Sequence, residues 1–355
     1  MGIVSQYVVN NLIDAKHPTF NSLRCVNRKQ KRQPCTICKD ICPNDVFQQR
    51  RGEPPVWNRC VNCNLCVAAC PSRCLTPSGE TLEKYLEGYD NSGVVRLGCR
   101  KEEEFCKIKE SCVGAIPWEF IAYLALRMKV EIYVRNCTGC PNETGLAMLQ
   151  DNLVHVLNFL GERLFEKNVL VIQEDADLPA KEEKTVSRTE LLGMLKQNMS
   201  KAALKLVPRL EENDFDGMLY RRLLANHVQK IHDDLADQGL KASFGVLLPK
   251  YNANCFACGT CGRLCPQDAI SYTEEKDGKR GIIITPWKCT GCGICNVVCR
   301  ESGMDGLTYI KVPHMQSLLL TRVPSATCTE CGKALDPKKG KTICGLCEMK
   351  LKKKR

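Results

Sequence analysis

Cysteine is the residue type that most plainly indicates chemistry in this chain, because it occupies 26 of the 355 positions. Most of the cysteines stand in short runs in which two residues separate one cysteine from the next. Two of these runs, at 60–71 and 255–266, have the spacing C-x2-C-x2-C-x3-C-P. Thiolates are strong ligands for soft metals, and this spacing lets one loop offer several sulfurs to one centre. The sequence therefore predicts metal sites suited to electron transfer.

A disulfide scaffold is the first alternative for so many thiols. Disulfide-rich proteins are usually small and secreted, whereas this chain is long enough for two or three domains. It begins MGIVSQYVVNNLIDAKH, without the basic, apolar and small-residue segments of a secretory signal and without a twin arginine. No apolar run approaches the roughly 20 residues of a membrane-spanning helix. We therefore expect a cytoplasmic protein with reduced, metal-binding thiols.

An internal repeat orders these runs, since the cysteine-rich block at 25–75 recurs at 255–300 with the same features. Each block resembles the dicluster ferredoxins, in which the fourth cysteine of each run binds the other [4Fe–4S] cluster. Structural zinc is the alternative for the second block. The resemblance implies that cluster III uses Cys255, Cys258, Cys261 and Cys299, and that cluster IV uses Cys265, Cys289, Cys292 and Cys295.

The amino-terminal block departs from the ferredoxin pattern at one ligand. Counting back from Cys42 reaches Cys38 and Cys35, but the next position of the pattern holds Arg32. Cys25 can supply this ligand if the basic segment after it is a looped insertion. Without Cys25 the site becomes a three-cysteine [3Fe–4S] cluster or a labile one. The resemblance implies Cys25, Cys35, Cys38 and Cys70 for cluster I, and Cys42, Cys60, Cys63 and Cys66 for cluster II.

Two further departures concern single residues. Cys299 is followed by Arg300 rather than by proline, which weakens the signal for a helix start without removing the ligand. Cys74 follows Cys70 by four residues, at a position where these ferredoxins usually carry a small residue. We interpret Cys74 as a packed thiol rather than a ligand.

The segment between the blocks alternates strand and helix patterns. Strands are predicted at 94–98, 130–135 and 168–173, and helices at 116–127 and 143–161. This alternation indicates a small parallel α/β sheet, whose ligands gather at the carboxyl ends of the strands. The predicted middle site lies at these ends or in the loops beyond them, and consists of Cys99, Cys112, Cys137 and Cys140.

The same segment resembles the [2Fe–2S] delta subunit of methyl-viologen-reducing hydrogenase, which passes electrons to a heterodisulfide reductase. The resemblance rests on the Cys-Val-Gly at 112–114 and the Cys-Thr-Gly-Cys-Pro at 137–141. That family has a close pair of cysteines near its first ligand, for which Cys99 and Cys106 are the counterpart at a wider gap. Either residue can therefore be the ligand. A [2Fe–2S] or [4Fe–4S] cluster, structural zinc and unligated thiols all remain open for this site.

Cysteine is absent from 174–250, and the composition there becomes charged. Ser187 and Glu190 have the spacing of a capping box before a helix at 191–198. A stripe of apolar residues within 215–239 predicts a second helix. We interpret 176–245 as a linker with spacer helices, with a partner-docking surface as the alternative. A metal site at His227 and His232 is disfavoured, because residues five apart do not share a helix face.

The tail contains two C-x2-C knuckles rich in glycine. Two such knuckles close a tetrahedral site of four sulfurs, as in zinc ribbons, although iron is held by similar knuckles in rubredoxins. We expect zinc, bound by Cys328, Cys331, Cys344 and Cys347.

The chain is basic, with 51 lysines and arginines against 40 acidic residues and a net charge of +11. The excess is concentrated at 28–32, at 338–341 and at the terminal KLKKKR. Such charge steers a carrier toward acidic faces of donor and acceptor redox enzymes, or toward anionic lipid around a membrane enzyme. The 6% aromatic content and the lack of a nucleic-acid-binding motif argue against nucleic acid as a partner.

These patterns predict a multidomain α+β protein. No flavin or nicotinamide fingerprint and no catalytic triad is present, so we expect a polyferredoxin-like electron-transfer subunit within a larger complex of an anaerobic cytoplasm, relaying single low-potential electrons. It would carry four [4Fe–4S] clusters, a further iron–sulfur cluster and one Zn²⁺. A reductase with a catalytic middle cluster and an iron–sulfur assembly or sensor protein are the alternatives. The predicted parts are an N-terminal helix at 1–20, ferredoxin domains at 21–90 and 246–312, an α/β domain at 91–175, the spacer at 176–245, and a zinc-ribbon-like tail at 313–355.

Overall fold

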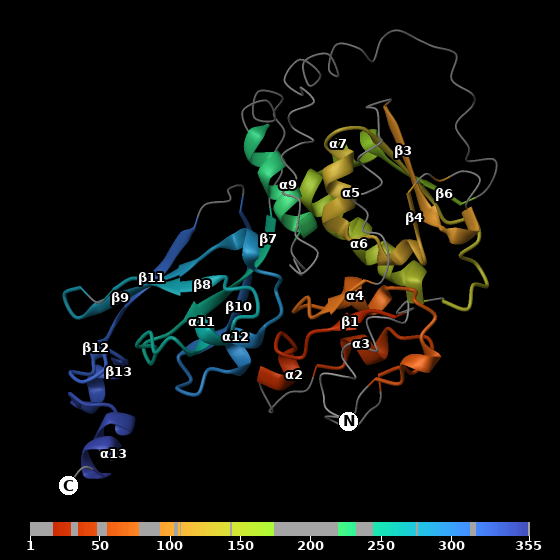
Figure 1. Cartoon of the computed structure of the whole chain (residues 1–355). Coiled ribbons are helices and arrows are strands. Elements are labelled where there is room, and N and C mark those ends of the chain that lie inside the picture. Colours follow the sequence, from red (N-terminus) through yellow and green to blue (C-terminus); the bar gives the residue numbers. More distant parts are fainter. Residues whose placement is uncertain are drawn as a thin grey trace. The chain divides into compact units, whose positions relative to one another are not determined.

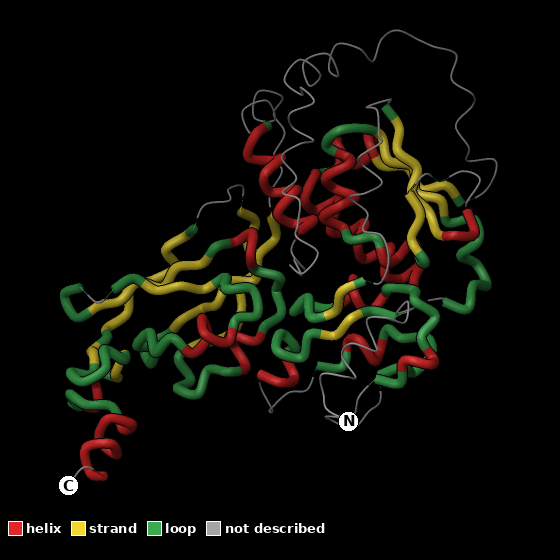
Figure 2. The backbone as a smooth tube through the Cα atoms, viewed as in Figure 1, coloured by secondary structure: helices red, strands yellow, loops and turns green. Residues whose placement is uncertain are grey.

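The computed structural model of the chain forms two compact units of mixed α/β structure with several small sheets (Figure 2). One unit comprises Met1–Asn21 with Thr36–Ala242, and the other Ser22–Cys35 with Ser243–Arg355. The helix predicted at 191–198 and His232 lie outside the described residues. The structure describes residues 17–29, 35–47, 55–77, 93–102, 106, 108–142, 144–173, 219–231, 244–274, 276–312 and 317–353.

In the first unit, the amino-terminal cysteine block is built from short elements. Strand β1 (Thr19–Phe20) pairs antiparallel with β2 (Leu75–Thr76), so the predicted helix at 1–20 does not reach Thr19. The rest of that predicted helix, up to residue 16, lies outside the described residues. Helices α3 (Ile37–Asp40), η1 (Trp57–Arg59) and α4 (Leu65–Ala69) carry the cysteine loops between the two strands.

The α/β domain contains a four-stranded parallel sheet, three strands of which the sequence pattern predicted. Its strands are β3 (Val94–Cys99), β4 (Ile108–Glu110), β5 (Lys129–Tyr133) and β6 (Val169–Ile172), in the order β4-β3-β5-β6. Helices α5 (Trp118–Ala125), α6 (Thr144–Leu160) and α7 (Glu162–Asn168) lie to one side of the strands in Figure 1. Two short 3-10 turns, η3 (Arg100–Glu102) and η4 (Val113–Ala115), follow strand ends. Strand β4 and helix α7 were not predicted from the sequence.

Alternation along the strands separates an apolar face from a polar one, because successive side chains of a strand point to opposite faces. Val95 and Leu97 of β3 are completely buried, as is Ile132 of β5. On the other face, Arg96 donates to Glu131 at 2.9 Å, and the hydroxyl of Tyr133 donates to the same carboxylate at 3.2 Å. The domain therefore has an apolar core of its own.

Helix α9 (Leu219–Lys230) packs against α5 within the same unit, which differs from the predicted spacer or docking surface. Its residues Leu224 and Ala225 are completely buried, and the ring of Tyr220 lies 5.2 Å from that of Phe120. Buried Glu119 of α5 accepts from Arg73 at 3.0 Å and from Arg221 at 3.5 Å. The apolar stripe of α9 is thus used internally, because burying it against α5 stabilises the fold.

Acidification should weaken this helix pair through His227. Burial, followed by the charges of Arg127 and Lys230, lowers the pKa of His227 to about 4. The imidazole ring contacts the ring of Tyr123 in an edge-to-face arrangement. In the unfolded chain the pKa returns to about 6.5, so the unfolded state binds more protons between pH 6.5 and 4. The contribution of His227 to the free energy of unfolding is complete above pH 6.5. It falls by up to about 3 kcal/mol as the pH drops through that window.

Hydrogen exchange of the α9 amides measures this loss, since it reports the free energy of local opening. His227→Leu should remove the pH dependence, while the exposed His155→Gln control should leave it unchanged. Protection of α9 that stays constant from pH 7 to 4.5 in the wild type would contradict the prediction.

The second unit begins with a segment from the amino-terminal block. Helix α2 (Val26–Lys29) places Val26 against Ile294 and Val298, and the side chain of Asn27 both donates to and accepts from the backbone of Cys35. Residues 22–35 therefore belong to this unit and not to a continuous domain at 21–90.

The remainder of the second unit is a small α+β domain followed by the tail. Strands β7 (Phe244–Tyr251) and β10 (Met304–Val312) pair antiparallel. A second sheet has the order β11-β9-β8, from β11 (Leu318–Pro324), β9 (Lys279–Ile284) and β8 (Ile270–Tyr272). Helices α11 (Thr260–Leu264), η8 (Pro286–Lys288) and α12 (Ile294–Val297) carry the cysteine runs. Since β11 pairs with β9, residues 318–324 belong to the domain rather than to a tail starting at 313.

The tail itself is formed by β12 (Ala326–Thr327), β13 (Ala334–Leu335), η9 (Pro337–Lys339) and α13 (Gly345–Lys353). Strands β12 and β13 pair antiparallel around the first cysteine knuckle. None of the helices in the described ranges combines the length and the apolar character that crossing a bilayer requires.

Candidate metal centres

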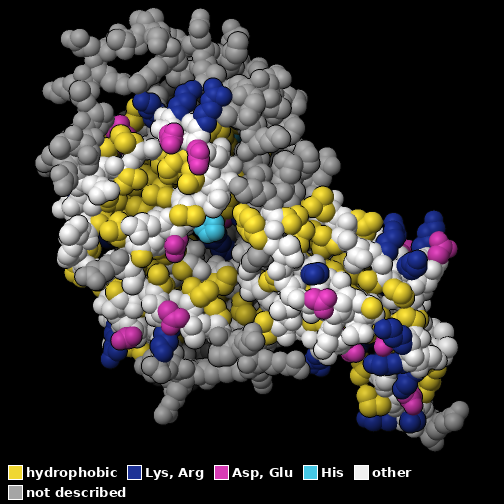
Figure 3. Space-filling model, turned by 180° about the vertical axis from the view of Figure 1, so that it is seen from behind, with side chains coloured by type: hydrophobic (Ala, Val, Ile, Leu, Met, Phe, Trp, Pro, Cys, Tyr) yellow, Lys and Arg dark blue, Asp and Glu magenta, His cyan; other side chains and the backbone are white. Residues whose placement is uncertain are grey.

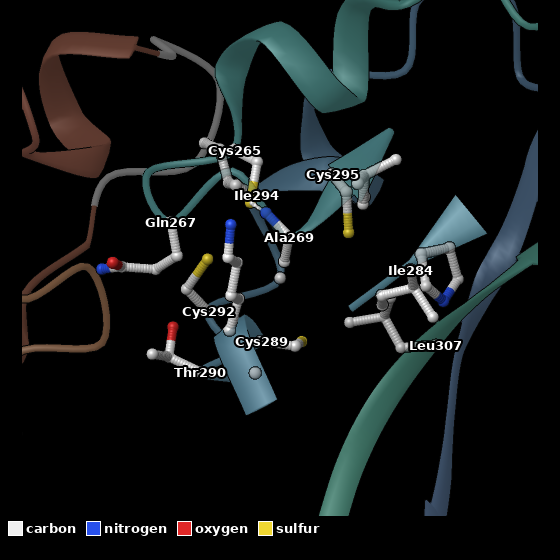
Figure 4. A pocket seen from close by; sticks show the side chains of 15 residues that line it. Cys265, Gln267, Ala269, Ile284, Cys289, Thr290, Cys292, Ile294, Cys295 and Leu307 are labelled. Carbon is white, nitrogen blue, oxygen red and sulfur yellow. Dashed lines mark hydrogen bonds between the residues drawn. The ribbon is translucent and has the colours of Figure 1, made fainter. Parts of the chain in front are cut away.

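Four cysteines from two separate runs line one cavity of the second unit (Figure 4). Cys265 follows α11, Cys289 and Cys292 lie in the loop that leads into α12, and Cys295 lies in α12 itself. Gly293 has φ +71° at the start of α12, a left-handed conformation that turns the loop back around the sulfurs. Apolar side chains of Ile270, Ile284 and Leu307 complete the wall. The cysteines brought together are Cys265, Cys289, Cys292 and Cys295.

A second cavity of the same unit has the reciprocal composition. Its thiols are those of the first run together with the last cysteine of the second run: Cys255, Cys258, Cys261 and Cys299. Two tyrosines also line it. The hydroxyl of Tyr272 lies 2.8 Å from the sulfur of Cys261, and that of Tyr251 lies 3.7 Å from it. The sequence patterns gave no sign of these tyrosines, because nothing in the cysteine spacing places a phenol beside a sulfur.

The thiols of both cavities suit a cationic centre. Burial first, and then mutual repulsion, raises the pKa of Cys255 and of Cys292 to about 11 and that of Cys295 to about 12. Burial also raises the pKa of Tyr251 and of Tyr272, which therefore keep their protons. Four half-buried sulfurs converge in each cavity, and a metal centre deprotonates such thiols outright. The donor set, four thiols for each cavity, fits a [4Fe–4S] cluster.

The first unit contains a comparable cavity in the amino-terminal block. It is lined by Cys42, Cys60, Cys63 and Cys66, and walled by Trp57, Phe47 and Val46. Burial, followed by the charges of neighbouring cysteines, raises the pKa of Cys60, Cys63 and Cys66. Asn64, with φ +59°, begins α4 and turns the loop between two of these cysteines. The sulfur donors again fit an iron–sulfur cluster.

The set predicted for cluster I is divided between the two units. Cys25 and Cys35 belong to one, and Cys38 and Cys70 to the other. The sulfur of Cys70 lies 3.4 Å from that of Cys74, and the backbone N–H of Cys74 donates to it at 3.3 Å. The Cys74 thiol, ahead of the opposing effect of burial, lowers the pKa of Cys70 to about 5. Cys74 is thus a hydrogen-bond partner of Cys70.

Cys112 of the middle site is seated by a close approach of η4 to the first turn of α6. A Cβ atom on Gly145 would collide with the sulfur of Cys112, and one on Gly114 would collide with the carbonyl of Gly145. Asn152 of α6 donates to the carbonyl of Gly114 at 3.3 Å and holds the turn in place. Both positions therefore require glycine because there is no room for a Cβ atom, and not because of the backbone conformation.

The electrostatic surroundings of Cys112 identify its neighbours. Burial raises its pKa to about 12, with further contributions from Cys63, Cys137 and Cys99. The ammonium of Lys101 lies 4.0 Å from the sulfur of Cys140. The structure therefore brings Cys99 and Cys137 toward Cys112, and a cysteine of the amino-terminal block, Cys63, joins them. The sequence patterns did not indicate this third neighbour.

Cys106 lies elsewhere in the α/β domain. It is 3% exposed and packs against Tyr133 and Ile172. Tyr133 belongs to the polar face of the sheet, because it alternates with buried Ile132. Between the two residues that the sequence left open, Cys99 is therefore the better candidate ligand.

We expect Cys99→Ser to abolish metal binding at the middle site, because it removes one of the thiols around Cys112. The matched variant Cys106→Ser should retain the metal, since its sulfur packs among side chains of the other sheet face. EPR spectra and iron content of the two anaerobically purified proteins make the comparison. Loss of the middle signal in Cys106→Ser alone would reverse the assignment.

The tail brings its four cysteines closest together. All four sulfurs of Cys328, Cys331, Cys344 and Cys347 lie within 4.8 Å of one another. The backbone N–H of Cys344 donates to the sulfur of Cys328 at 3.2 Å and is the main reason that the pKa of Cys328 falls to about 6. Four converging thiols of this kind fit a tetrahedral metal ion.

Comparison with protein families supports one of these regions. Residues 254–302 match the 4Fe-4S dicluster domain family, a stretch that contains all eight cysteines of the two cavities in the second unit. The match covers well under half of the chain. Comparison with the curated proteins and with the solved structures found no significant match.

Proposed function

We propose that this chain is a multi-cluster iron–sulfur protein that relays single electrons between a donor and an acceptor enzyme. The observation that carries the proposal is the reciprocal grouping of cysteines in the second unit. Cys299 joins the first run in one cavity, and Cys265 joins the second run in the other. The match of this region to the 4Fe-4S dicluster domain family supports iron–sulfur clusters there, and such clusters serve electron transfer.

The proposed ligand sets follow from these groupings. Bound at such thiols, an iron–sulfur cluster accepts and returns one electron without other chemistry. We assign the two cavities of the second unit to clusters III and IV, and the cavity with Cys42, Cys60, Cys63 and Cys66 to cluster II. We assign the middle site to Cys99, Cys112, Cys137 and Cys140, and zinc to the four cysteines of the tail.

Packing within the first unit favours a continuous relay. Cys63, a proposed ligand of cluster II, and Cys112, of the middle site, pack into one apolar cluster with Leu65, Ala115 and Met148. The likeness of this segment to the hydrogenase delta subunit supports an iron–sulfur cluster at the middle site. Apolar packing between two ligand cysteines keeps water out of the path and holds their separation fixed. The chain's own side chains thereby position neighbouring redox centres.

The charge of the surface supports acidic partners. Lysine and arginine side chains gather at the C-terminal tail in Figure 3, where Lys339, Lys341 and Lys352 are 59%, 61% and 75% exposed. Basic patches accelerate association with acidic protein faces and do so less at high salt. We propose donor and acceptor enzymes with acidic docking faces, within a cytoplasmic complex.

Anaerobic purification with iron, sulfide and zinc analysis tests the proposed function. The expected result is about sixteen or more irons, a similar amount of sulfide and about one zinc per chain. One-electron reduction of the bound clusters should appear by EPR, and a basic-to-neutral variant of the tail should change only the salt dependence of electron delivery. Zinc in place of iron in the ferredoxin runs would refute the proposal.

A further inference from the structure

The two cavities of the second unit differ in the hydrogen bonds offered to their sulfurs. In one cavity, Tyr272 at the end of β8 and Tyr251 at the end of β7 both direct hydroxyls at Cys261, at 2.8 Å and 3.7 Å. The backbone N–H of Gly262 donates to the oxygen of Tyr272 at 3.1 Å. Because that bond uses a lone pair of the oxygen, the hydroxyl proton is free to point at the sulfur.

The approach of Tyr272 is built into the fold. A Cβ atom on Gly262 would lie 2.7 Å from a ring carbon of Tyr272 and 2.8 Å from the carbonyl oxygen of Ile270. Only glycine at this position lets the phenol reach the sulfur. Both tyrosines pack against the apolar cluster formed by Ile270, Ile282 and their neighbours, which fixes the rings.

No tyrosine lines the other cavity. Its polar lining side chains besides the cysteines are Gln267, Lys288 and Thr290, and its apolar wall includes Pro249, Ile284 and Leu307. Each cavity has one threonine near a sulfur: Thr260 lies 3.3 Å from Cys258 in the first, and Thr290 bonds to Cys292 in the second. The two phenols directed at Cys261 are therefore particular to the first cavity.

Hydrogen bonds to ligand sulfurs stabilise the reduced cluster, which carries one more negative charge, and so raise its reduction potential. We propose that Tyr272 and Tyr251 raise the reduction potential of cluster III through hydrogen bonds to the sulfur of Cys261. This inference rests on the proposed function. The tyrosines are tuning residues that act through Cys261.

The test is a redox titration followed by EPR on the full chain with its clusters assembled anaerobically. Tyr272→Phe keeps the ring and removes the hydroxyl. One cluster should then shift to lower potential by about 59 mV, a tenfold change for a one-electron couple. Tyr251→Phe, with the longer contact, should give a smaller shift in the same direction. Tyr309→Phe, an exposed tyrosine of β10, is the matched control and should give none.

Electron–nuclear double resonance after exchange into deuterated water assigns the shifted cluster. The component whose potential shifts in Tyr272→Phe should show, in the wild type, an exchangeable proton coupling that this variant removes. Because Gly262 also loses an acceptor in that variant, Tyr251→Phe provides an independent measurement.

Two outcomes would overturn the inference, and they are distinguishable. Normal iron content with unchanged potentials in both phenylalanine variants would remove the tuning role and leave the proposed function intact. A wild-type chain that assembles no [4Fe–4S] cluster in this unit would refute the proposed function and the inference together.

Discussion

Replacement of Cys344 by serine is expected to abolish metal binding in the tail and to unfold residues 326–353. The physical reason is the near absence of an apolar core there. Helix α13 has no buried residue, and its Leu346 and Met349 are 58% and 56% exposed. Structural zinc contributes about 10–16 kcal/mol in small domains of this kind, far more than the few buried contacts of β12 and β13 can supply. We therefore expect a bound ion to hold the tail together.

Zinc content and the NMR spectrum of the tail amides make the measurement. Glu330→Gln removes the charge of an exposed side chain within the same knuckle. This variant is the control and should keep both zinc and the dispersed amide signals. Chelation of zinc from the wild type should reproduce the effect of Cys344→Ser. A variant that keeps its α13 signals after losing the metal would show that the tail folds without it.

The exchange of the fourth cysteine between the two runs of the second unit predicts a pattern of iron loss. Cys299→Ser should cost up to about four irons, because a cluster held by three cysteines is labile. Adding Cys258→Ser, in the same cavity, should cost no more. Adding Cys292→Ser, in the other cavity, should raise the loss to about eight.

Iron analysis of the single and double variants distinguishes the arrangements. If Cys299 belonged with its own run, the two double variants would exchange their results. Cys74→Ser is the control and should keep the full complement, since Cys74 is a hydrogen-bond partner of Cys70 and not a proposed ligand. One double variant should lose half of the iron of this unit and the other should lose all of it. A difference of this size is insensitive to modest losses of iron during purification.

Local pattern was sufficient for the parallel sheet of the α/β domain. The runs at 94–98, 130–135 and 168–173 are rich in β-branched residues, and the structure places strands in all three. Strand β4 was missed because the three residues of Ile108–Glu110 are too few to show a period. Helix α9 was recognised as a helix, but an amphipathic stripe does not say which surface covers it.

The resemblance to dicluster ferredoxins implied the groups of thiols that line the three cavities. It did not reveal contacts made by residues of another kind. The phenol of Tyr272 and the paired glycines Gly114 and Gly145 depend on how separate elements meet, which no local period encodes. The basic insertion after Cys25 interrupts the spacing, and the packing of Val26 against Ile294 has no sequence signal at all.

The apolar core of the α/β domain has a consequence for how the protein matures. Residues such as Val95, Phe120 and Leu124 are completely buried without help from any thiol, so this domain can fold before iron is delivered. The described parts of the cysteine loops at 36–77 have far less apolar surface of their own. Their Leu65, however, packs against Cys112 and Met148 of the α/β domain. We expect the α/β domain of the first unit to fold first. The amino-terminal cysteine loops should then fold against it as their cofactor is inserted.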